Sequence, residues 1–114
     1  MSEIRIAIVG CGGIALQNHL PGIEMCQDAP LVALCDNNAA TLERAQADTG
    51  IKIASTQFED IVTRDDVDAV IIATPNLFHA PIAHAAIKAA KHVLCEKPVA
   101  MSYQDAKDMA VAAD

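Results

Sequence analysis

The chain has 114 residues and a formal net charge of −7, and 53% of its residues are hydrophobic although only 3% are aromatic. This length suits one domain with an aliphatic core, and no apolar run reaches the roughly 20 residues that cross a bilayer, so we expect no membrane partner. The acidic balance and the lack of a Lys/Arg cluster exclude nucleic-acid binding through a basic surface.

Apolar runs that suit buried strands alternate along the chain with segments of helical character. The strands are expected at residues 4–9, 31–36, 51–54, 68–74 and 91–95. The helices are expected at residues 13–25, 38–49 and 79–89, with a short one after residue 56 and a last one after residue 102. Two helix starts and one helix end carry clear signals. Asn37 or Asn38 should be an N-cap, Gly50 should be the glycine after a helix end, and Thr56 with Glu59 matches a capping box.

Strands that alternate with helices predict βαβ units with right-handed crossovers. We therefore expect an α/β fold of the Rossmann type, a doubly wound parallel sheet with strand order 3-2-1-4-5. No sixth strand follows within the 114 residues, so the strand at 91–95 should be an exposed edge of the sheet.

A glycine-rich turn directly follows the first expected strand. It runs Gly10-Cys11-Gly12-Gly13-Ile14-Ala15. Gly10 should allow a tight turn, Gly12 should let a pyrophosphate approach the backbone, and Ala15 is small enough for the next helix to pack on the strand. The amino terminus of that helix adds free N–H groups and a partial positive charge. We predict a dinucleotide-binding turn in which Cys11 is a small spacer.

Asp36 ends the second expected strand, at the offset of about 20 residues at which an acidic residue accepts hydrogen bonds from the adenosine ribose. Its carboxylate should also repel the 2′-phosphate of NADP, and no arginine follows it to offset that repulsion. With its neighbour Asn37, it predicts NAD as the cofactor rather than NADP. The alternative is a Rossmann-like domain with a vestigial site.

A second motif, Glu96-Lys97-Pro98, follows the apolar run at residues 92–95. Because parallel strands end at one edge of a sheet, the motif should lie on the same edge as the glycine turn. Lys97 there could handle the proton of a reacting hydroxyl, or it could be an ordinary solvated lysine. Glu96 could simply pair with Lys97 or cap a neighbour, and Pro98 could hold the neighbouring backbone in a fixed bend.

Together these motifs resemble the amino-terminal domain of the Gfo/Idh/MocA oxidoreductases, the glucose-fructose oxidoreductase and inositol dehydrogenase family. The resemblance rests on residues 10–15, Asp36, Ala73-Thr74-Pro75-Asn76 with His79, Lys91-His92-Val93 and Glu96-Lys97-Pro98. It implies that Lys97 is catalytic, beside the nicotinamide and the substrate hydroxyl, and acts with an Asp and a His from a carboxyl-terminal domain. It also implies that the segment from Thr74 to Asn76 lines the cofactor and that Glu96 helps to hold the nicotinamide side. Asn76 and His79 could equally be helix caps.

The resemblance implies hydride transfer between a nicotinamide cofactor and a sugar, inositol or other polyol hydroxyl. Residues 1–114 would then be the NAD(P)-binding domain of a larger two-domain dehydrogenase, because no substrate domain follows within them. Two alternatives stay open: a stand-alone NAD-binding or interaction module without turnover, and an NAD-dependent glycoside hydrolase of the same family. Association into a homo-oligomer is a further open point.

One residue departs from the family pattern, since members usually have a glycine before the Lys-His-Val segment and this chain has Ala90. If that position is left-handed, alanine is strained there by about 1 kcal/mol.

The four cysteines show no C-x-x-C pairing and no zinc-ligand spacing, so we expect no metal site. Cys35 and Cys95 lie in apolar strand patterns and should be small buried hydrophobes. This cysteine usage fits a reducing compartment, and we expect a cytoplasmic protein.

Overall fold

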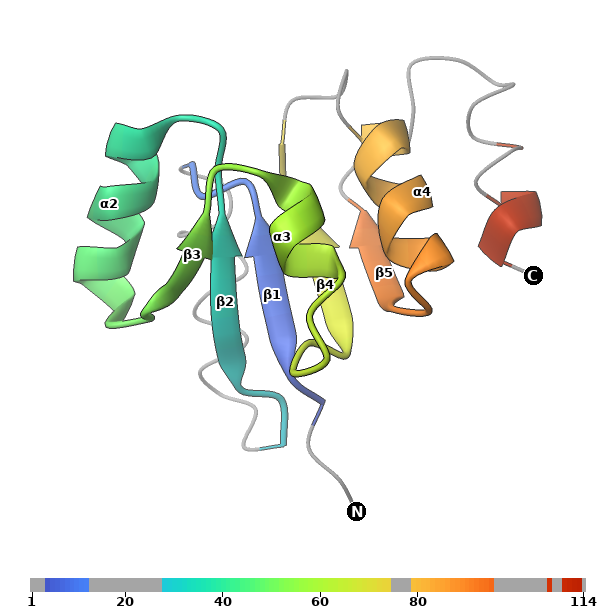
Figure 1. Ribbon diagram of the computed structural model, residues 1–114, viewed down its shortest axis with the longest axis horizontal. Coiled ribbons are helices and arrows are strands. Elements are labelled where there is room, and N and C mark those ends of the chain that lie inside the picture. The colour runs from blue at the N-terminus through green and yellow to red at the C-terminus, as the bar shows by residue number, and fades with distance from the viewer. Residues whose placement is uncertain (1–3, 13–27, 75–78, 96–106, 108–109, 114) are drawn as a thin grey trace.

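The computed structural model describes residues 4–12, 28–74, 79–95, 107 and 110–113. Within them, five parallel strands form one sheet in the order β3-β2-β1-β4-β5, which confirms the predicted fold class and strand order (Figure 1). The strands are β1 (Ile6–Val9), β2 (Leu31–Cys35), β3 (Ile53–Ser55), β4 (Ala69–Ile72) and β5 (His92–Cys95). The helices are α2 (Ala39–Thr49), α3 (Phe58–Val62) and α4 (His79–Lys88). The helix expected at 13–25 lies outside the described residues, as does most of the last one.

The strands are shorter than the apolar runs that predicted them. The third strand shows why, because it begins at Ile53 rather than at residue 51. Thr49 Oγ1 accepts a hydrogen bond from the N–H of Ile51 at 3.2 Å, so Ile51 belongs to the turn that leaves α2. The turn and not the hydrophobic pattern sets where this strand starts.

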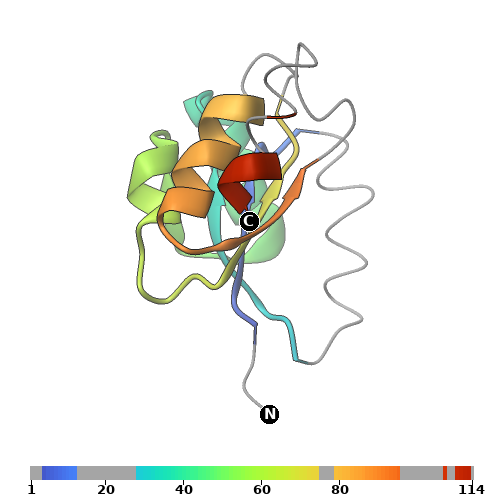
Figure 2. The ribbon, with the colours of Figure 1, turned by 90° about the vertical axis from the view of Figure 1, so that its right-hand side faces the viewer.

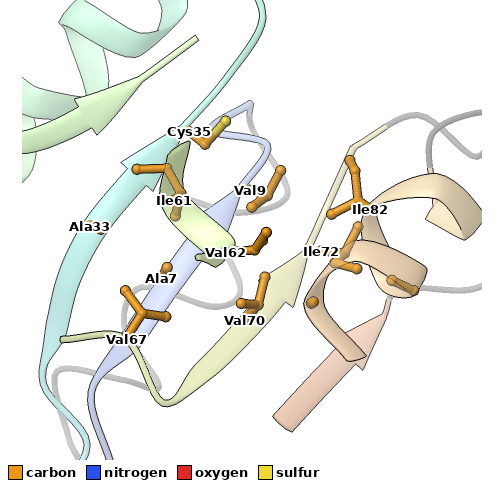
Figure 3. Packing of buried hydrophobic residues seen from close by; sticks show 12 residues of the cluster. Ala7, Val9, Ala33, Cys35, Ile61, Val62, Val67, Val70, Ile72 and Ile82 are labelled. Atoms are coloured by element: carbon orange, nitrogen blue, oxygen red, sulfur yellow. The ribbon is translucent and has the colours of Figure 1, made fainter. Parts of the chain in front are cut away.

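The core is built on both faces of the sheet, as strand alternation requires. Ala7 and Val9 point to the face that α3 and α4 cover, whereas Ile8 points to the face where Leu42 of α2 packs. Figures 1 and 2 show α3 and α4 side by side on the first face, and Figure 3 shows the aliphatic cluster beneath them. Small side chains such as Ala33 let the helices approach the sheet closely. The core is therefore aliphatic on both faces of the sheet, and a pocket lies at the carboxyl ends of the strands.

Helix α2 has the ends that the sequence predicts. Asn38 is its N-cap, and its side chain accepts a hydrogen bond from the N–H of Thr41 at 3.0 Å. Gly50 ends the helix in the left-handed conformation, with φ of 76°. Local signals were sufficient here because both caps act within one turn of chain.

The capping box predicted for α3 is wrong. The N-cap is Gln57 rather than Thr56, and no side chain caps it. Instead, Ser55 at the end of β3 accepts a hydrogen bond from the N–H of Gln57 at 3.0 Å, and its hydroxyl donates to Asp60 at 2.8 Å. The serine that ends the strand therefore takes the place that the sequence pattern gave to Thr56.

Ala90 is the only described non-glycine residue with positive φ, at 63°, which confirms the left-handed position considered above. Its N–H donates to the carbonyl of Ile87, and the N–H of Lys91 donates to that of Ala86, both at 2.9 Å. This pair of bonds is a Schellman motif, a helix ending that favours glycine at the left-handed residue. Lys91 continues the connection, because its Nζ donates to the carbonyls of Arg64 and Val67 at 2.6 Å each.

An ion pair lies at the amino-terminal ends of β1 and β4. Arg5, just before β1, donates from its backbone N–H and from Nε to Asp68 Oδ2 at 2.8 and 2.9 Å, and from Nη2 to Oδ1 at 3.0 Å. These bonds keep the pKa of the Asp68 carboxyl well below its usual range. The pair fixes the start of β1 against the start of β4, at the ends of the strands that lie opposite the glycine turn.

Among the described residues, strand β5 is one edge of the sheet, as expected, and Leu94 on it is 55% exposed. Over the described ranges, no helix has both the length and the apolar character that a bilayer crossing would need.

Candidate dinucleotide-binding site

A pocket of about 450 Å³ lies at the carboxyl ends of β1, β2 and β4. Its lining consists of Val9, Gly10, Gly12, Cys35, Asp36, Asn37, Thr41, Thr56, Gln57, Phe58, Ala73, Thr74 and Ile82. In the sheet, β1 has β2 on one side and β4 on the other. The chain builds the sheet outward from β1 in one direction and then continues from β4 in the opposite direction, so the pocket lies at the point where the strand order reverses. That switch point is where open α/β sheets bind ligands.

Gly10 leaves β1 in a conformation that only glycine adopts readily, with φ of 100°. A Cβ atom there would lie 2.6 Å from the carbonyl carbon of Ala73 and 2.7 Å from the nitrogen of Thr74. On the other side, the N–H of Gly10 donates to the carbonyl of Cys35 at 2.7 Å. The turn is thus packed between the ends of β4 and β2, and both its φ and this close packing require a glycine.

Gly12 differs from Gly10, because a Cβ atom there would meet no atom of the described residues within 4 Å. Gly12 lines the pocket, so the space beside it is open to a ligand. The packing of the described residues therefore does not itself require a glycine at this point. Gly13, Ile14 and Ala15, which complete the predicted motif, lie outside the described residues.

Asp36 follows β2 and lines the same pocket. Its Oδ2 accepts a hydrogen bond from the backbone N–H of Cys11 at 2.9 Å, and its Oδ1 accepts one from the N–H of Asn38 at 2.8 Å. The carboxylate therefore joins the glycine turn to the turn that opens α2. Neighbouring Asn37 also lines the pocket, so the glycine turn and the acidic residue predicted from the sequence meet at one site.

Cys11 is 1% exposed, and its thiol donates to the carbonyl of Cys35 at 3.4 Å. Burial, and to a smaller degree the negative charge of Asp36, raise the pKa of the Cys11 thiol to about 12. Burial likewise raises the pKa of Cys35 to about 12. Cys11 is therefore a protonated, buried thiol near neutral pH, and not a nucleophile activated by a helix terminus.

Thr74, predicted to line the cofactor, does line the pocket, and His79 begins α4. The paired ends of β4 and β5, Ile72 and Cys95, lie side by side, so the chain after Cys95 starts from the same edge of the sheet. The remaining predicted site residues, Pro75, Asn76, Glu96, Lys97 and Pro98, lie outside the described residues. Among the residues that the structure does describe, no group of His, Cys, Asp and Glu side chains could hold a metal ion.

Sequence reasoning missed one wall of the pocket. It comprises Thr41 of α2, the segment Thr56-Gln57-Phe58 at the start of α3, and Ile82 of α4. The capping-box pattern at Thr56 predicts a helix start and not a ligand site, and no local motif marks Thr41 or Ile82. These residues reach the site because β3 lies beside β2, α3 packs on β1, β2 and β3, and α4 packs on β4 and β5, so the predicted strand order was the only signal that could have found them.

The comparisons with known proteins agree with this geometry. The model of the Gfo/Idh/MocA family, described as an oxidoreductase family with an NAD-binding Rossmann fold, matches residues 4–114. The WlbA dehydrogenase from Bordetella pertussis, solved in complex with NADH and UDP-GlcNAcA, is 37% identical with a TM-score of 0.91, over 98% of this chain and 34% of that one. A 3-ketoreductase from Actinomadura kijaniata, solved with NADP and TDP-benzene, is 29% identical with a TM-score of 0.89, over 98% of this chain and 35% of that one.

Among relatives known from sequence, a glycosyl hydrolase family 109 protein from Shewanella amazonensis is 34% identical over 125 aligned positions, which cover 100% of this chain and 27% of that protein. The chain thus spans about a third or less of the length of the proteins that it matches. It belongs to the Gfo/Idh/MocA oxidoreductase family and corresponds to that family's NAD-binding Rossmann domain.

Proposed function

We propose that this chain binds NAD and is the cofactor domain of an oxidoreductase that moves a hydride between the nicotinamide and a carbon bearing a hydroxyl group on a sugar, inositol or other polyol. The observation that carries the proposal is the meeting of the glycine turn and the Asp36 carboxylate in one pocket at the switch point of the sheet. A turn for the pyrophosphate and an acceptor for the ribose are the two parts that dinucleotide recognition needs.

The pocket accounts for the adenosine half of the cofactor. Its volume of about 450 Å³ lies within the range of small-molecule sites. The partly buried Phe58 offers apolar surface to the adenine ring, and the Asp36 carboxylate offers acceptors to the ribose hydroxyls. The open space beside Gly12 leaves room for the pyrophosphate next to the backbone.

The same pocket favours NAD over NADP. Asp36 would face the 2′-phosphate of NADP with a like charge, and the pocket lining that the structure describes contains no lysine or arginine to offset it. The relatives include a structure with NADH and another with NADP, so the family accommodates both cofactors, and the local charge supports the choice of NAD.

The chemistry proposed for the complete protein uses Lys97. Bound NAD supplies a hydride acceptor or donor at C4 of the nicotinamide. Lys97 takes the proton of the substrate hydroxyl during oxidation and returns it during reduction, which is general acid–base work. Glu96 helps to hold the nicotinamide side, and Pro98 holds the neighbouring backbone in a fixed bend. The segment from Thr74 to Asn76, with His79 beyond it, lines the cofactor. A substrate domain supplies the partner Asp and His.

A second candidate is glycoside hydrolysis by transient oxidation with the same cofactor domain. It is favoured by the 34% identity to a glycosyl hydrolase family 109 protein. The two candidates differ in their products: a dehydrogenase changes the ratio of NAD to NADH as substrate is consumed, whereas the hydrolase releases a sugar without net change in cofactor.

Calorimetric titration with NADH and NADPH tests the binding proposal on the 114-residue chain. We expect NADH to bind, and to bind more tightly than NADPH. A chain without turnover but with this binding would still be a cofactor module, so the catalytic proposal needs its own test. In the full-length protein, Lys97→Ala should lower kcat with little change in NADH affinity; unchanged kcat would remove Lys97 from the mechanism.

We further propose a cytoplasmic location, in keeping with Cys11 and Cys35, which are free, buried thiols.

A further inference from the structure

We propose that Asp36 is a positioning residue for the glycine turn in addition to an acceptor for the cofactor ribose: its carboxylate holds the turn in the shape that receives the pyrophosphate. This inference rests on the proposed NAD binding and adds a second role for the residue that selects the cofactor.

The geometry of the carboxylate carries the first step. Its two oxygens accept from two backbone donors, Cys11 N–H at 2.9 Å and Asn38 N–H at 2.8 Å. Cys11 stands 25 positions before Asp36 and lies in the middle of the glycine turn. The bond to Asn38 closes a local turn that fixes the carboxylate itself, as aspartate side chains commonly do two residues ahead. One side chain therefore connects two turns that come from different strands.

The surroundings of Cys11 make this connection important. Cys11 is 1% exposed, and its backbone N–H has the Asp36 oxygen as its acceptor. A buried N–H that loses its acceptor is costly, and a bond to a charged acceptor is stronger than a neutral one. The next residue is Gly12, whose backbone borders the open space of the pocket. Movement of the turn to find another acceptor for Cys11 would therefore displace the surface that receives the pyrophosphate.

The two roles of Asp36 are compatible with one another. A carboxylate offers about four acceptor positions, and the two backbone bonds use two of them. The remaining positions can accept the two hydroxyls of the adenosine ribose. Asparagine at this position cannot reproduce this arrangement, because its NH₂ group accepts no hydrogen bond. Whichever way the amide is turned, it would face either Cys11 or Asn38 with a donor instead of an acceptor.

Two ligands separate the roles: ADP, and 2′,3′-dideoxy-ADP, which lacks the ribose hydroxyls but keeps the diphosphate. Their affinities are measured by calorimetry for the wild-type chain, Asp36→Ala and Asp36→Asn. Asp48→Asn, which removes one exposed negative charge from α2, is the matched control. Circular dichroism sets a temperature at which every variant is folded, so that a loss of stability alone does not change the affinities.

We expect both Asp36 variants to bind dideoxy-ADP about tenfold more weakly than the wild type, from the loss of a half-buried, charge-assisted hydrogen bond. Removal of a negative charge would by itself raise the affinity for an anionic ligand, so the change in charge cannot produce this loss of affinity. The Asp48→Asn control should bind both ligands as the wild type does. If dideoxy-ADP binds the Asp36 variants as tightly as the wild type or more tightly, Asp36 serves only the ribose and the inference is overturned.

Hydrogen exchange provides a readout that needs no ligand. In Asp36→Asn, the amide of Cys11 should exchange faster than in the wild type, while that of Ile8 in the centre of β1 should not change. Equal protection of Cys11 in both proteins would overturn the positioning role. If instead the wild-type chain binds neither ADP nor NADH while Cys11 behaves as expected, the proposed function fails and the connection between the two turns stands.

Discussion

Replacement of Ala90 by glycine should stabilise the fold. Ala90 has φ of 63°, and a left-handed backbone costs a residue with a Cβ atom about 1–2 kcal/mol. Glycine removes that strain, but it adds conformational freedom to the unfolded chain, which offsets about 0.4–1 kcal/mol. Ala90 is exposed, so the lost methyl group sacrifices little packing. The two hydrogen bonds of the helix ending involve backbone atoms and are kept.

The net expectation for Ala90→Gly is a gain of about 0.5–1 kcal/mol in the free energy of unfolding, or roughly 2–4 °C in the melting temperature. Urea unfolding followed by circular dichroism measures it. Ala89→Gly is the matched control, because Ala89, the residue after α4, still donates a helix-type hydrogen bond to the carbonyl of Ala85 and glycine should lower stability there. A destabilised Ala90→Gly, or two variants with equal effects, would refute the reasoning from the backbone angle.

Four further predictions follow from the same contacts. Lys91→Met should lower the free energy of unfolding by about 1–3 kcal/mol, because two carbonyls before β4 lose the ammonium that donates to them; wild-type stability in urea would contradict this. The lowered pKa of Asp68 adds stability that is complete above pH 3.8, the usual pKa of an aspartate, and is lost as the pH falls further. Asp68→Asn should therefore make the free energy of unfolding less dependent on pH in acid. An unchanged pH–stability profile would disprove this role of Asp68. The raised pKa values of Cys11 and Cys35 add stability that is complete below pH 9 and is lost as the pH rises toward about 12. After treatment with iodoacetamide at pH 8, peptide mapping should find both thiols unmodified in the folded chain and modified in urea. Rapid labelling of the folded chain would contradict their burial. Asp36→Ala should raise the affinity for NADPH relative to NADH even as both weaken, and an unchanged ratio would remove the charge argument for NAD.

The parts of the fold that were predictable from the sequence depend on local chemistry. The N-cap was limited to Asn37 or Asn38, and Gly50 was identified as the residue after the helix end, because each signal acts within one turn of α2. The strand order followed from the alternation of apolar runs with helices, which leaves few right-handed arrangements. Gly10 was identified as a turn residue from its place after an apolar strand.

The features that could not be predicted from the sequence depend on contacts between segments that are far apart in the chain. Thr56 matched a capping pattern, but Ser55 at the end of β3 took the Gln57 N–H instead. Asp36 was predicted as a ribose acceptor, yet its bond to Cys11 becomes visible only when β1 and β2 lie side by side. Phe58 belongs to no binding motif and lines the pocket only because the sheet places its segment there.

Leu94 shows the same limit in another form. The edge position of β5 was predictable, whereas the 55% exposure of this one side chain required the structure.

The central claim is that the glycine turn and Asp36 form an NAD site, and titration of the chain with NADH and, in parallel, NADPH tests it most directly. The account predicts saturable binding of NADH, with NADPH at least several-fold weaker because of the like charges of Asp36 and the 2′-phosphate. Binding of neither cofactor, or tighter binding of NADPH, would contradict it.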